Sequence, residues 1–218
     1  MTYVVWDWNG TLLDDTQAAL DTLNAMLARR GGKSITMDFY RDNFAFPVKP
    51  FYESIGVRVG NEDWDALARE YHDVYAEQPK RLNGEALAAL EYARGMGCRQ
   101  SIVSALRQDL LADITAELGV SKYMDFVYGV DNLDGRSKVD RARELVAAIS
   151  ESSVGSRPSA SDFVFIGDSL HDKEVADAIG VRCVLCAQGS HAAWRLRAVA
   201  PTGDTLLESV RMAIGGMT

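Results

Sequence analysis

The sequence predicts an α/β protein with a Rossmann-like parallel-sheet core and an inserted α-helical cap domain. Two observations lead to this class. From residue 83 onward, short continuous apolar runs alternate with amphipathic helical patterns, which is typical of a parallel sheet with helices on both faces. The first apolar run, residues 2–6, is separated from the next, which begins at residue 99, by a segment whose patterns are helical.

The core elements follow one another at short intervals. Residues 2–6 are β-branched and aromatic, and they read as a fully buried strand. We expect helices over 85–96, 108–118, 138–149 and 172–179, and strands over 99–105, 125–129, 163–167 and 181–186. The serine-rich stretch 150–161 is expected to be a loop. We therefore assign residues 1–15 and 83–218 to the core domain.

The inserted segment, residues 16–82, is expected to form the cap. Leu20, Leu23 and Leu27 recur at helical spacing, so a helix is expected over 16–30, with Thr16 as its cap and two glycines at its end. Residues 34–60 are mixed, with aromatic residues, prolines and short helical pieces. A second amphipathic helix is expected over 63–77.

Charge and composition restrict the class of partner. The net charge is −8 and the isoelectric point is about 4.9, which argues against a nucleic-acid or anionic-membrane partner. The start of the chain has no pattern of a signal peptide, and no apolar run reaches the length of about 18 residues that a membrane span needs. We expect a cytoplasmic protein. Cys183 and Cys186 lie in an apolar strand, so core packing is expected there instead of metal or redox chemistry.

Polar residues follow several of the predicted strands, where parallel sheets bind ligands. Asp7, Asn9, Gly10 and Thr11 follow the first strand, Ser104 and Ala105 close the second, and Gly167, Asp168, Ser169 and Asp172 follow the fourth; Lys138 begins the helix before the fourth. A single Asp or Ser after a strand is often only a helix cap. An acid after two strands, with a serine after a third and a lysine at the start of a helix, favours a functional site.

This arrangement resembles the haloacid dehalogenase superfamily over nearly the whole chain. The motifs are "VVWDWNGTLLDD" after the first strand, "SIVSA" closing the second, "GRSKVDRA" before the fourth and "FIGDSLHDKEVADAIG" after it. The helical insertion looks like the cap of the phosphoglycolate phosphatase and β-phosphoglucomutase relatives in that superfamily. Because all four motifs occur in order, the resemblance implies phosphoryl-transfer chemistry.

The resemblance also implies roles for individual residues. Asp7 would be the nucleophile, Lys138 would supply a fixed positive charge, and Ser104 would donate to a phosphate oxygen. Backbone N–H groups near Asn9, Gly10, Thr11 and Ala105 would add to phosphate binding. The expected ion is Mg²⁺, bound by Asp7, Asp168 and the backbone carbonyl of Asn9, with Asp172 supporting the site.

Asn9 departs from the family pattern, which has a second aspartate there that moves a proton. An amide cannot carry that proton at neutral pH, and general acid–base help is typically worth roughly 10²–10⁴-fold. Four explanations remain open. The substrate has a good leaving group such as an acyl phosphate; another group substitutes (His72, Lys49, or a water near Asp14 or Asp15); the asparagine is an engineered change; or the protein is a weak or inactive relative.

The cap is expected to select the substrate. Arg41 and Lys49 are candidates for binding a substrate carboxylate or second phosphate. The alternative is that both side chains are ordinary solvated charges on the surface of the cap. His171 is not expected to bind metal, and His72 is expected at the surface. We predict a Mg²⁺-dependent phosphatase for a small phosphorylated metabolite, as a monomer or homodimer. The alternatives are a phosphotransferase or mutase of the same family, and a non-catalytic binding or regulatory relative.

Overall fold

The computed structural model describes residues 1–58, 60–130, 138–153 and 157–215. Its six strands form one sheet in the order β3-β2-β1-β4-β5-β6, and every strand pairing within it is parallel. The strands are β1 Tyr3–Trp6, β2 Arg99–Arg107, β3 Phe126–Val130, β4 Phe163–Gly167, β5 Arg182–Cys186 and β6 Thr202–Gly203. The first strand lies at the centre, as in a doubly wound Rossmann-like sheet. The predicted α/β class is confirmed.

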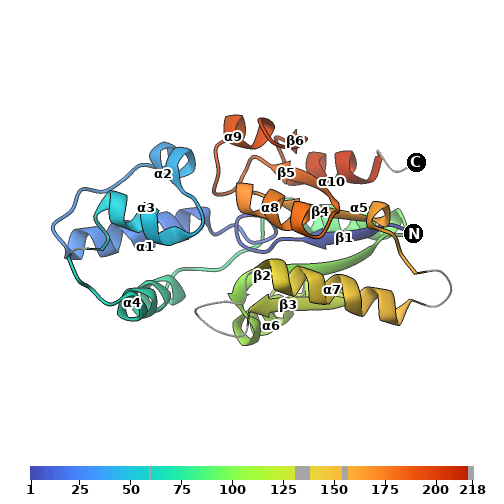
Figure 1. Cartoon of the computed structure of the whole chain (residues 1–218), viewed down its shortest axis with the longest axis horizontal. Helices are drawn as coiled ribbons and strands as arrows, with labels where there is room; N and C mark the ends of the chain where they lie inside the picture. The colour runs from blue at the N-terminus through green and yellow to red at the C-terminus, as the bar shows by residue number, and fades with distance from the viewer. Residues whose placement is uncertain (59, 131–137, 154–156, 216–218) are drawn as a thin grey trace.

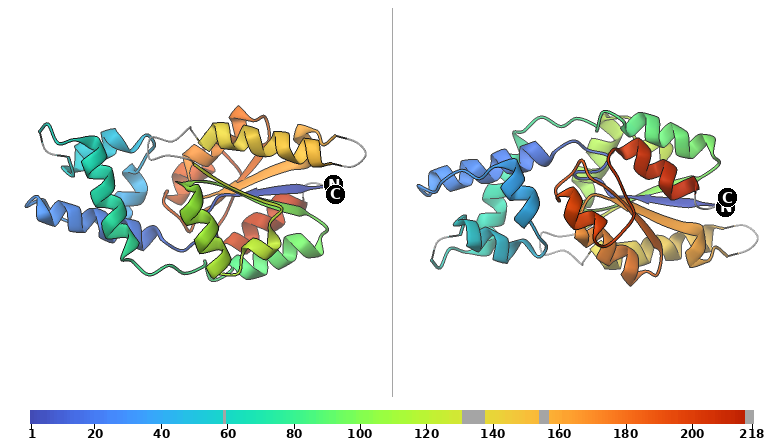
Figure 2. Two further views of the ribbon diagram at one scale, coloured as in Figure 1. Left: turned by 90° about the horizontal axis from the view of Figure 1, so that it is seen from below. Right: turned by 90° about the horizontal axis from the view of Figure 1, so that it is seen from above.

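Helices cover both faces of this sheet (Figure 2). One face packs against α5 Ala86–Gly95, α6 Gln108–Glu117 and α10 Leu206–Gly215; the other packs against α7 Lys138–Ser152, α8 Leu170–Ala178 and α9 Ala193–Arg197. Successive residues of β1 alternate between the two layers, so Val4 and Trp6 join one buried cluster while Tyr3 and Val5 join the other. Both faces of the strand are therefore buried, as its continuous apolar sequence predicts.

Four helices are inserted between β1 and α5. They are α1 Thr16–Arg29, α2 Met37–Asn43, α3 Val48–Ile55 and α4 Trp64–Ala76, and they lie together at the end of the molecule remote from both termini (Figure 1). Their apolar side chains, among them Leu23, Leu27, Phe51 and Leu67, form a third buried cluster whose members all lie between residues 20 and 71. Because this group has its own core, we propose that residues 16–82 act as a cap on a core of 1–15 and 83–218.

Several boundaries differ from the sequence predictions for local physical reasons. Thr16 does not cap α1: Asp15 holds the N-cap position, and its side chain accepts no cap hydrogen bond from that helix. Helix α8 begins at Leu170 instead of 172, because Ser169 and Asp172 form a capping box. Helix α7 runs to Ser152, beyond the predicted end at 149.

The elements after residue 186 were not predicted. They are α9, the two-residue strand β6 and α10. Strand β6 is too short to give a periodic signal. Helix α10 does carry one, since its buried Leu206, Val210, Ala213 and Ile214 recur at spacings of three and four.

The cysteines pack in the core. Cys98, Cys183 and Cys186 are free and buried. Cys183 belongs to the cluster under α7 and α8, whereas Cys186 belongs to the cluster under α5 and α10, so the two thiols lie on opposite faces of β5. They therefore cannot share a ligand. Within the described residues, none of the helices has both the length and the apolar character required to cross a bilayer.

Candidate active site

Two adjacent strand ends bring three carboxylates together. Asp7 directly follows β1 and Asp168 directly follows β4; the two strands pair in parallel, and the Asp7 N–H donates to the Ile166 carbonyl at 2.8 Å. Asp172 lies in the first turn of α8. Each of the three acids is buried and offers one oxygen within 4.8 Å of the others. Like charges this close together give the site a strongly negative electrostatic potential.

Lys138 joins two of these acids. It begins α7, is 5% exposed, and its Nζ contacts Asp7 Oδ1 and lies 2.5 Å from Asp172 Oδ1. Among the described residues, Lys138 makes no ion pair with Asp168. Burial alone would lower the pKa of Lys138, but the charges of Asp172 and Asp7 outweigh it and raise that pKa. The lysine is thus a permanent, buried cation.

The three acids respond differently to this environment. Burial raises the pKa of Asp7 well above its usual value; Lys138 opposes the rise, and the charges of Asp172 and Asp168 add to it. Burial, followed by the charge of Asp172, raises the pKa of Asp168 to about 6. Burial also opposes ionisation of Asp172, but Lys138 and Ser169 together lower its pKa. Two of the three carboxylates are therefore poorly compensated by the protein.

Asp168 sits in a closely fitted cradle. Its Oδ2 accepts from the backbone N–H and the hydroxyl of Ser190, at 2.6 and 2.5 Å, and its Oδ1 accepts from Thr11 Oγ1 at 3.1 Å. A Cβ on Gly189 would lie 2.1 Å from Asp168 Oδ2, and one on Gly10 would lie 2.5 Å from the same atom. Only glycine at positions 10 and 189 lets the backbone come this close to the Asp168 carboxylate, and Gly10 also has a positive φ of 75°.

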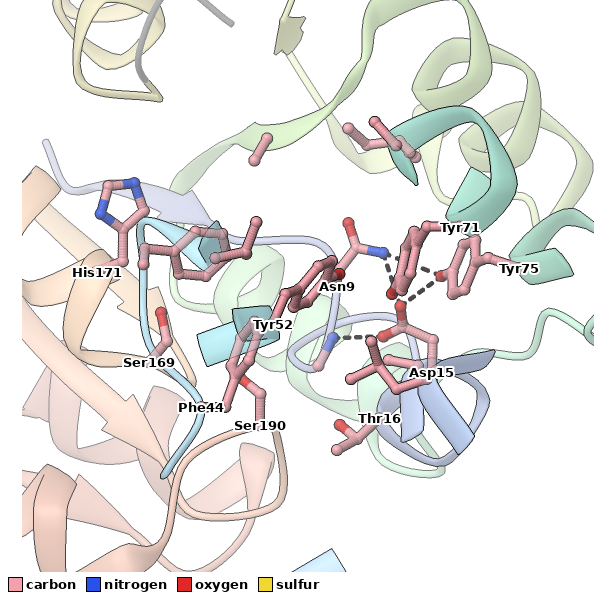
Figure 3. A pocket seen from close by; sticks show the side chains of 18 of the residues that line it. Asn9, Asp15, Thr16, Phe44, Tyr52, Tyr71, Tyr75, Ser169, His171 and Ser190 are labelled. Atoms are coloured by element: carbon pink, nitrogen blue, oxygen red, sulfur yellow. Dashed lines mark hydrogen bonds between the residues drawn. The ribbon is translucent and has the colours of Figure 1, made fainter. Parts of the chain in front are cut away.

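Asn9 takes part in a different network, toward the cap (Figure 3). Its Nδ2 donates to Asp15 Oδ2 at 2.7 Å and to the Tyr75 hydroxyl at 3.2 Å. Asp15 also accepts from the Gly10 N–H at 2.6 Å and from the Tyr75 hydroxyl at 2.5 Å. Burial raises the pKa of Asp15, although these three donors act in the opposite direction. The amide of Asn9 is thus matched to a carboxylate and a phenol.

A cavity of about 360 Å³ opens above the acids, between the sheet and helices α1–α4. Its floor includes Asp7, Asn9, Lys138 and Asp168. Aromatic and aliphatic side chains of the inserted helices line the rest, and Figure 3 shows Phe44, Tyr52, Tyr71 and Tyr75 around the space in front of Asn9. The arrangement places a cluster of three carboxylates and a fixed cation at the base of a mainly apolar cavity.

Known proteins resemble this chain in sequence and in fold. The sequence profile of the haloacid dehalogenase-like hydrolases matches residues 4–186. The chain belongs to that family. A phosphoglycolate phosphatase of Rhodobacter capsulatus is 26% identical over 85% of this chain and 84% of its own length; one from Xanthomonas campestris is 28% identical over 85% and 83%. A haloacid dehalogenase-like hydrolase from Streptococcus pneumoniae has the same fold, with a TM-score of 0.77 at 17% identity over 97% of this chain and 98% of its own.

The other residues singled out in this haloacid dehalogenase-like hydrolase lie at varied distances from the cavity. Gly10, Ala105, Asp172 and Lys49 line it. Lys49 is exposed, with its Nζ 5.2 Å from the centre of the Trp64 ring. His72, expected at the surface, also lines the cavity, and burial lowers its pKa.

Three predicted residues of the hydrolase do not line the cavity. Thr11 lies beneath it, with its hydroxyl between Asp7 and Asp168. Ser104 is buried and lies 3.4 Å from Asn9 Oδ1. The Arg41 guanidinium points to the core, where it donates to the carbonyls of Gly189 and Gln188 at 2.9 and 3.0 Å. Arg41 therefore connects α2 to the loop that holds Asp168.

Sequence reasoning missed three residues of the site, namely Tyr75, Gly189 and Ser190, and it named Asp15 only as a place near which a water could be held. The segment "CAQGS" follows β5, so the rule that polar residues at strand ends form the site would have identified Gly189 and Ser190 had it been applied to that strand. Tyr75 gave no such signal, because its position opposite Asp15 depends on how α4 packs against α1.

Proposed function

We propose that this hydrolase is a Mg²⁺-dependent phosphatase that cleaves a small phosphorylated metabolite through an aspartyl-phosphate on Asp7. The phosphoglycolate phosphatases among its relatives support phosphate-ester chemistry. The observation that carries the proposal is the state of the Asp7 carboxylate, which lies at the cavity floor and has poorer hydrogen bonding than its neighbours.

The partners of the three acids explain why Asp7 would be the nucleophile. Asp172 accepts from the N–H groups of Asp168 and Ser169, and Asp168 accepts from the N–H of Ser190. Among the described residues, the Asp7 carboxylate accepts only from the side chains of Lys138 and Thr11. Fewer fixed donors leave its lone pairs more available for attack on phosphorus.

The charge of the phosphate would be balanced by nearby cations and donors. Lys138 supplies one positive charge directly beside the nucleophile. The Gly10 N–H already donates to Asp15, which leaves the amides of Asn9 and Ala105 as the candidate donors for phosphate oxygens. Ser104 would orient the Asn9 carboxamide instead of meeting the substrate directly.

The donor set fits a hard divalent cation. Three buried carboxylates face one lysine, and the pKa values of Asp7 and Asp168 are raised first by burial and then by the charge of neighbouring carboxylates, both of which a bound cation would offset. Asp7, Asp168 and the Asn9 carbonyl would hold Mg²⁺, while Asp172, already engaged with Lys138 and the α8 amides, would orient the site. Bound there, the ion would reduce repulsion between an anionic nucleophile and an anionic phosphate.

A phosphotransferase remains a second candidate because of Asn9. The same amide that cannot protonate a leaving group cannot activate water either, so a phosphorylated Asp7 would persist and could pass its phosphoryl group to another acceptor. The test is phosphate release from a panel of esters and acyl phosphates, with Mg²⁺ or with a chelator, for the wild type and Asp7→Asn. Mg²⁺-dependent release that Asp7→Asn abolishes supports the phosphatase; product formation without phosphate release supports the phosphotransferase.

A further inference from the structure

The wall of the cavity opposite the acids is aromatic. Its aromatic members are Tyr40, Phe44, Phe46, Tyr52, Trp64, Tyr71 and Tyr75. The rings contact one another, with Tyr71 stacked on Tyr75 at 5.8 Å between centroids and Tyr52 at 6.2 Å from Tyr71. Faces of this kind bind a planar apolar group well, since offset stacking adds to the burial of area.

Positive charge is scarce on the same wall. Among the described residues that line the cavity, there is no arginine, and the lysines are Lys138, which is paired with Asp7 and Asp172, and Lys49, which is exposed beside Trp64. Burial lowers the pKa of His72, so that side chain is neutral near pH 7. A substrate with a second anionic group would therefore find little to compensate its charge there.

Three tyrosine hydroxyls on this wall are available for hydrogen bonds to a ligand. Within the described part of the chain, the hydroxyls of Tyr40, Tyr52 and Tyr71 make no hydrogen bond, whereas the hydroxyl of Tyr75 donates to Asp15. Burial raises the pKa of all three, so they remain neutral donors. They can bind polar substituents on the rim of a flat ligand.

The floor of the cavity selects the leaving group. The Asn9 carboxamide, held by Asp15 and Tyr75, cannot give a proton to a departing oxygen. An aryl oxide, whose conjugate acid has a pKa of about 10, can leave without one, whereas an alkoxide, with a conjugate acid near that of water at about 16, cannot do so readily. The aromatic wall and the Asn9 side chain on the floor thus both favour an aryl leaving group.

We infer that the substrate is an aryl phosphate monoester, whose flat body packs against the tyrosines while its phosphate meets Asp7. This inference rests on the proposed phosphatase function. The size agrees, because an apolar cavity of about 150 Å³ holds benzene and this one measures about 360 Å³. A phenyl ring with its phosphate, or a bicyclic ring system, therefore fits.

The reaction balances without a side-chain acid at position 9. A carboxylate oxygen of Asp7 bonds to phosphorus as the bond to the aryl oxygen breaks, and the aryl oxide leaves with the electron pair. Water then attacks the phosphorus of the aspartyl-phosphate and returns Asp7 to its carboxylate form; because Asn9 cannot take a proton from that water, this second step is the slower one. One proton of that water stays on the phosphate and the other reaches the aryl oxide through solvent, so ester and water give phenol and hydrogen phosphate.

The test compares kcat/KM for four compounds with Mg²⁺: phenyl phosphate, cyclohexyl phosphate, 2-phosphoglycolate and acetyl phosphate. We expect phenyl phosphate to exceed cyclohexyl phosphate, of similar size, on the order of 10²-fold or more, and to exceed 2-phosphoglycolate. Hydrolysis of cyclohexyl phosphate or 2-phosphoglycolate as fast as phenyl phosphate would overturn the inference and leave the phosphatase intact. So would release from acetyl phosphate alone. Release from none of the four would overturn the proposed function, and the inference with it.

A matched pair of variants tests the aromatic wall. Tyr71→Leu should raise KM for phenyl phosphate about tenfold, and by clearly more than it raises KM for acetyl phosphate, which has no ring to stack. Phe39→Leu is the control, because Phe39 is 43% exposed on α2 and does not line the cavity. Thermal unfolding of both variants establishes that they fold. If a folded Tyr71→Leu protein kept the wild-type KM for phenyl phosphate, the stacking part of the inference would be wrong.

Discussion

The Nδ2 of Asn9 donates to Asp15 Oδ2 at 2.7 Å, so the amide at position 9 is the hydrogen-bonding complement of a buried carboxylate. A carboxylate at position 9 would instead face Asp15 with like charge at the same distance. One of the pair would then have to hold a proton, or the side chain would have to turn away. The amide at position 9 therefore contributes to the stability of the surrounding hydrogen-bond network, independently of its effect on the reaction rate.

Exchanging the two side chains tests this relationship. Asn9→Asp alone is expected to reduce the free energy of unfolding by about 1–3 kcal/mol at pH 7, because the hydrogen bond is lost and two carboxylates meet. The double variant Asn9→Asp with Asp15→Asn should recover most of the loss, since the pair is restored in reverse. Urea unfolding of the full double-mutant cycle measures the coupling. Simple additivity would show that the two side chains do not interact.

The cradle of Asp168 predicts a severe effect at Gly189. A methyl group there would overlap Asp168 Oδ2, so Gly189→Ala should displace the carboxylate and weaken Mg²⁺ activation by about 10–100-fold. Gly95→Ala is the control, because a Cβ at Gly95 has no neighbour within 4 Å and needs no positive φ. The two variants are compared by titrating their activity with Mg²⁺. Equal Mg²⁺ affinities would show that the close contact between Gly189 and Asp168 does not position the metal.

The contacts of Arg41 predict that its substitution affects Mg²⁺ activation more than substrate binding. Since its guanidinium donates to Gly189 and Gln188 and does not line the cavity, Arg41→Gln should raise the Mg²⁺ concentration for half-activation several-fold. KM at saturating Mg²⁺ should change less than twofold. The reverse pattern, a large change in KM alone, would return Arg41 to the substrate-binding role that its sequence position first suggested.

His191 predicts a loss of stability in acid. It is 1% exposed, its Nδ1 accepts from the Leu170 N–H, and burial, followed by the charge of Arg195, lowers its pKa from 6.5 to about 4. Between these values the unfolded chain binds a proton that the native protein does not, so stability falls as pH falls from about 6.5 to 4, by at most about 3 kcal/mol. Urea unfolding of the wild type and His191→Gln between pH 7 and 4.5 isolates this effect, because contributions from Asp7 and Asp168 occur in both. Parallel pH curves would contradict it.

Local patterns predicted most of the sheet and its rim. The first and fourth strands are continuous apolar runs, and Asp7 and Asp168 directly follow them, as the chemistry of strand ends predicts. Ser104, which was expected to close the second strand, lies within β2, because that strand continues to Arg107. What could not be predicted depends on packing between distant segments. The packing of α4 against α1 brings Tyr75 to Asp15 and Asn9, and the position of α2 turns Arg41 away from the cavity. Sequence periodicity carries no information about such contacts.

Trapping the intermediate tests the central role of Asp7 most directly. The protein is mixed with acetyl phosphate and Mg²⁺, quenched in acid, digested and examined by mass spectrometry. We predict one phosphoryl group on the peptide that contains Asp7, removable by hydroxylamine and absent from Asp7→Asn. Phosphate release without any such adduct, or with equal release by Asp7→Asn, would contradict the assignment of Asp7 as nucleophile.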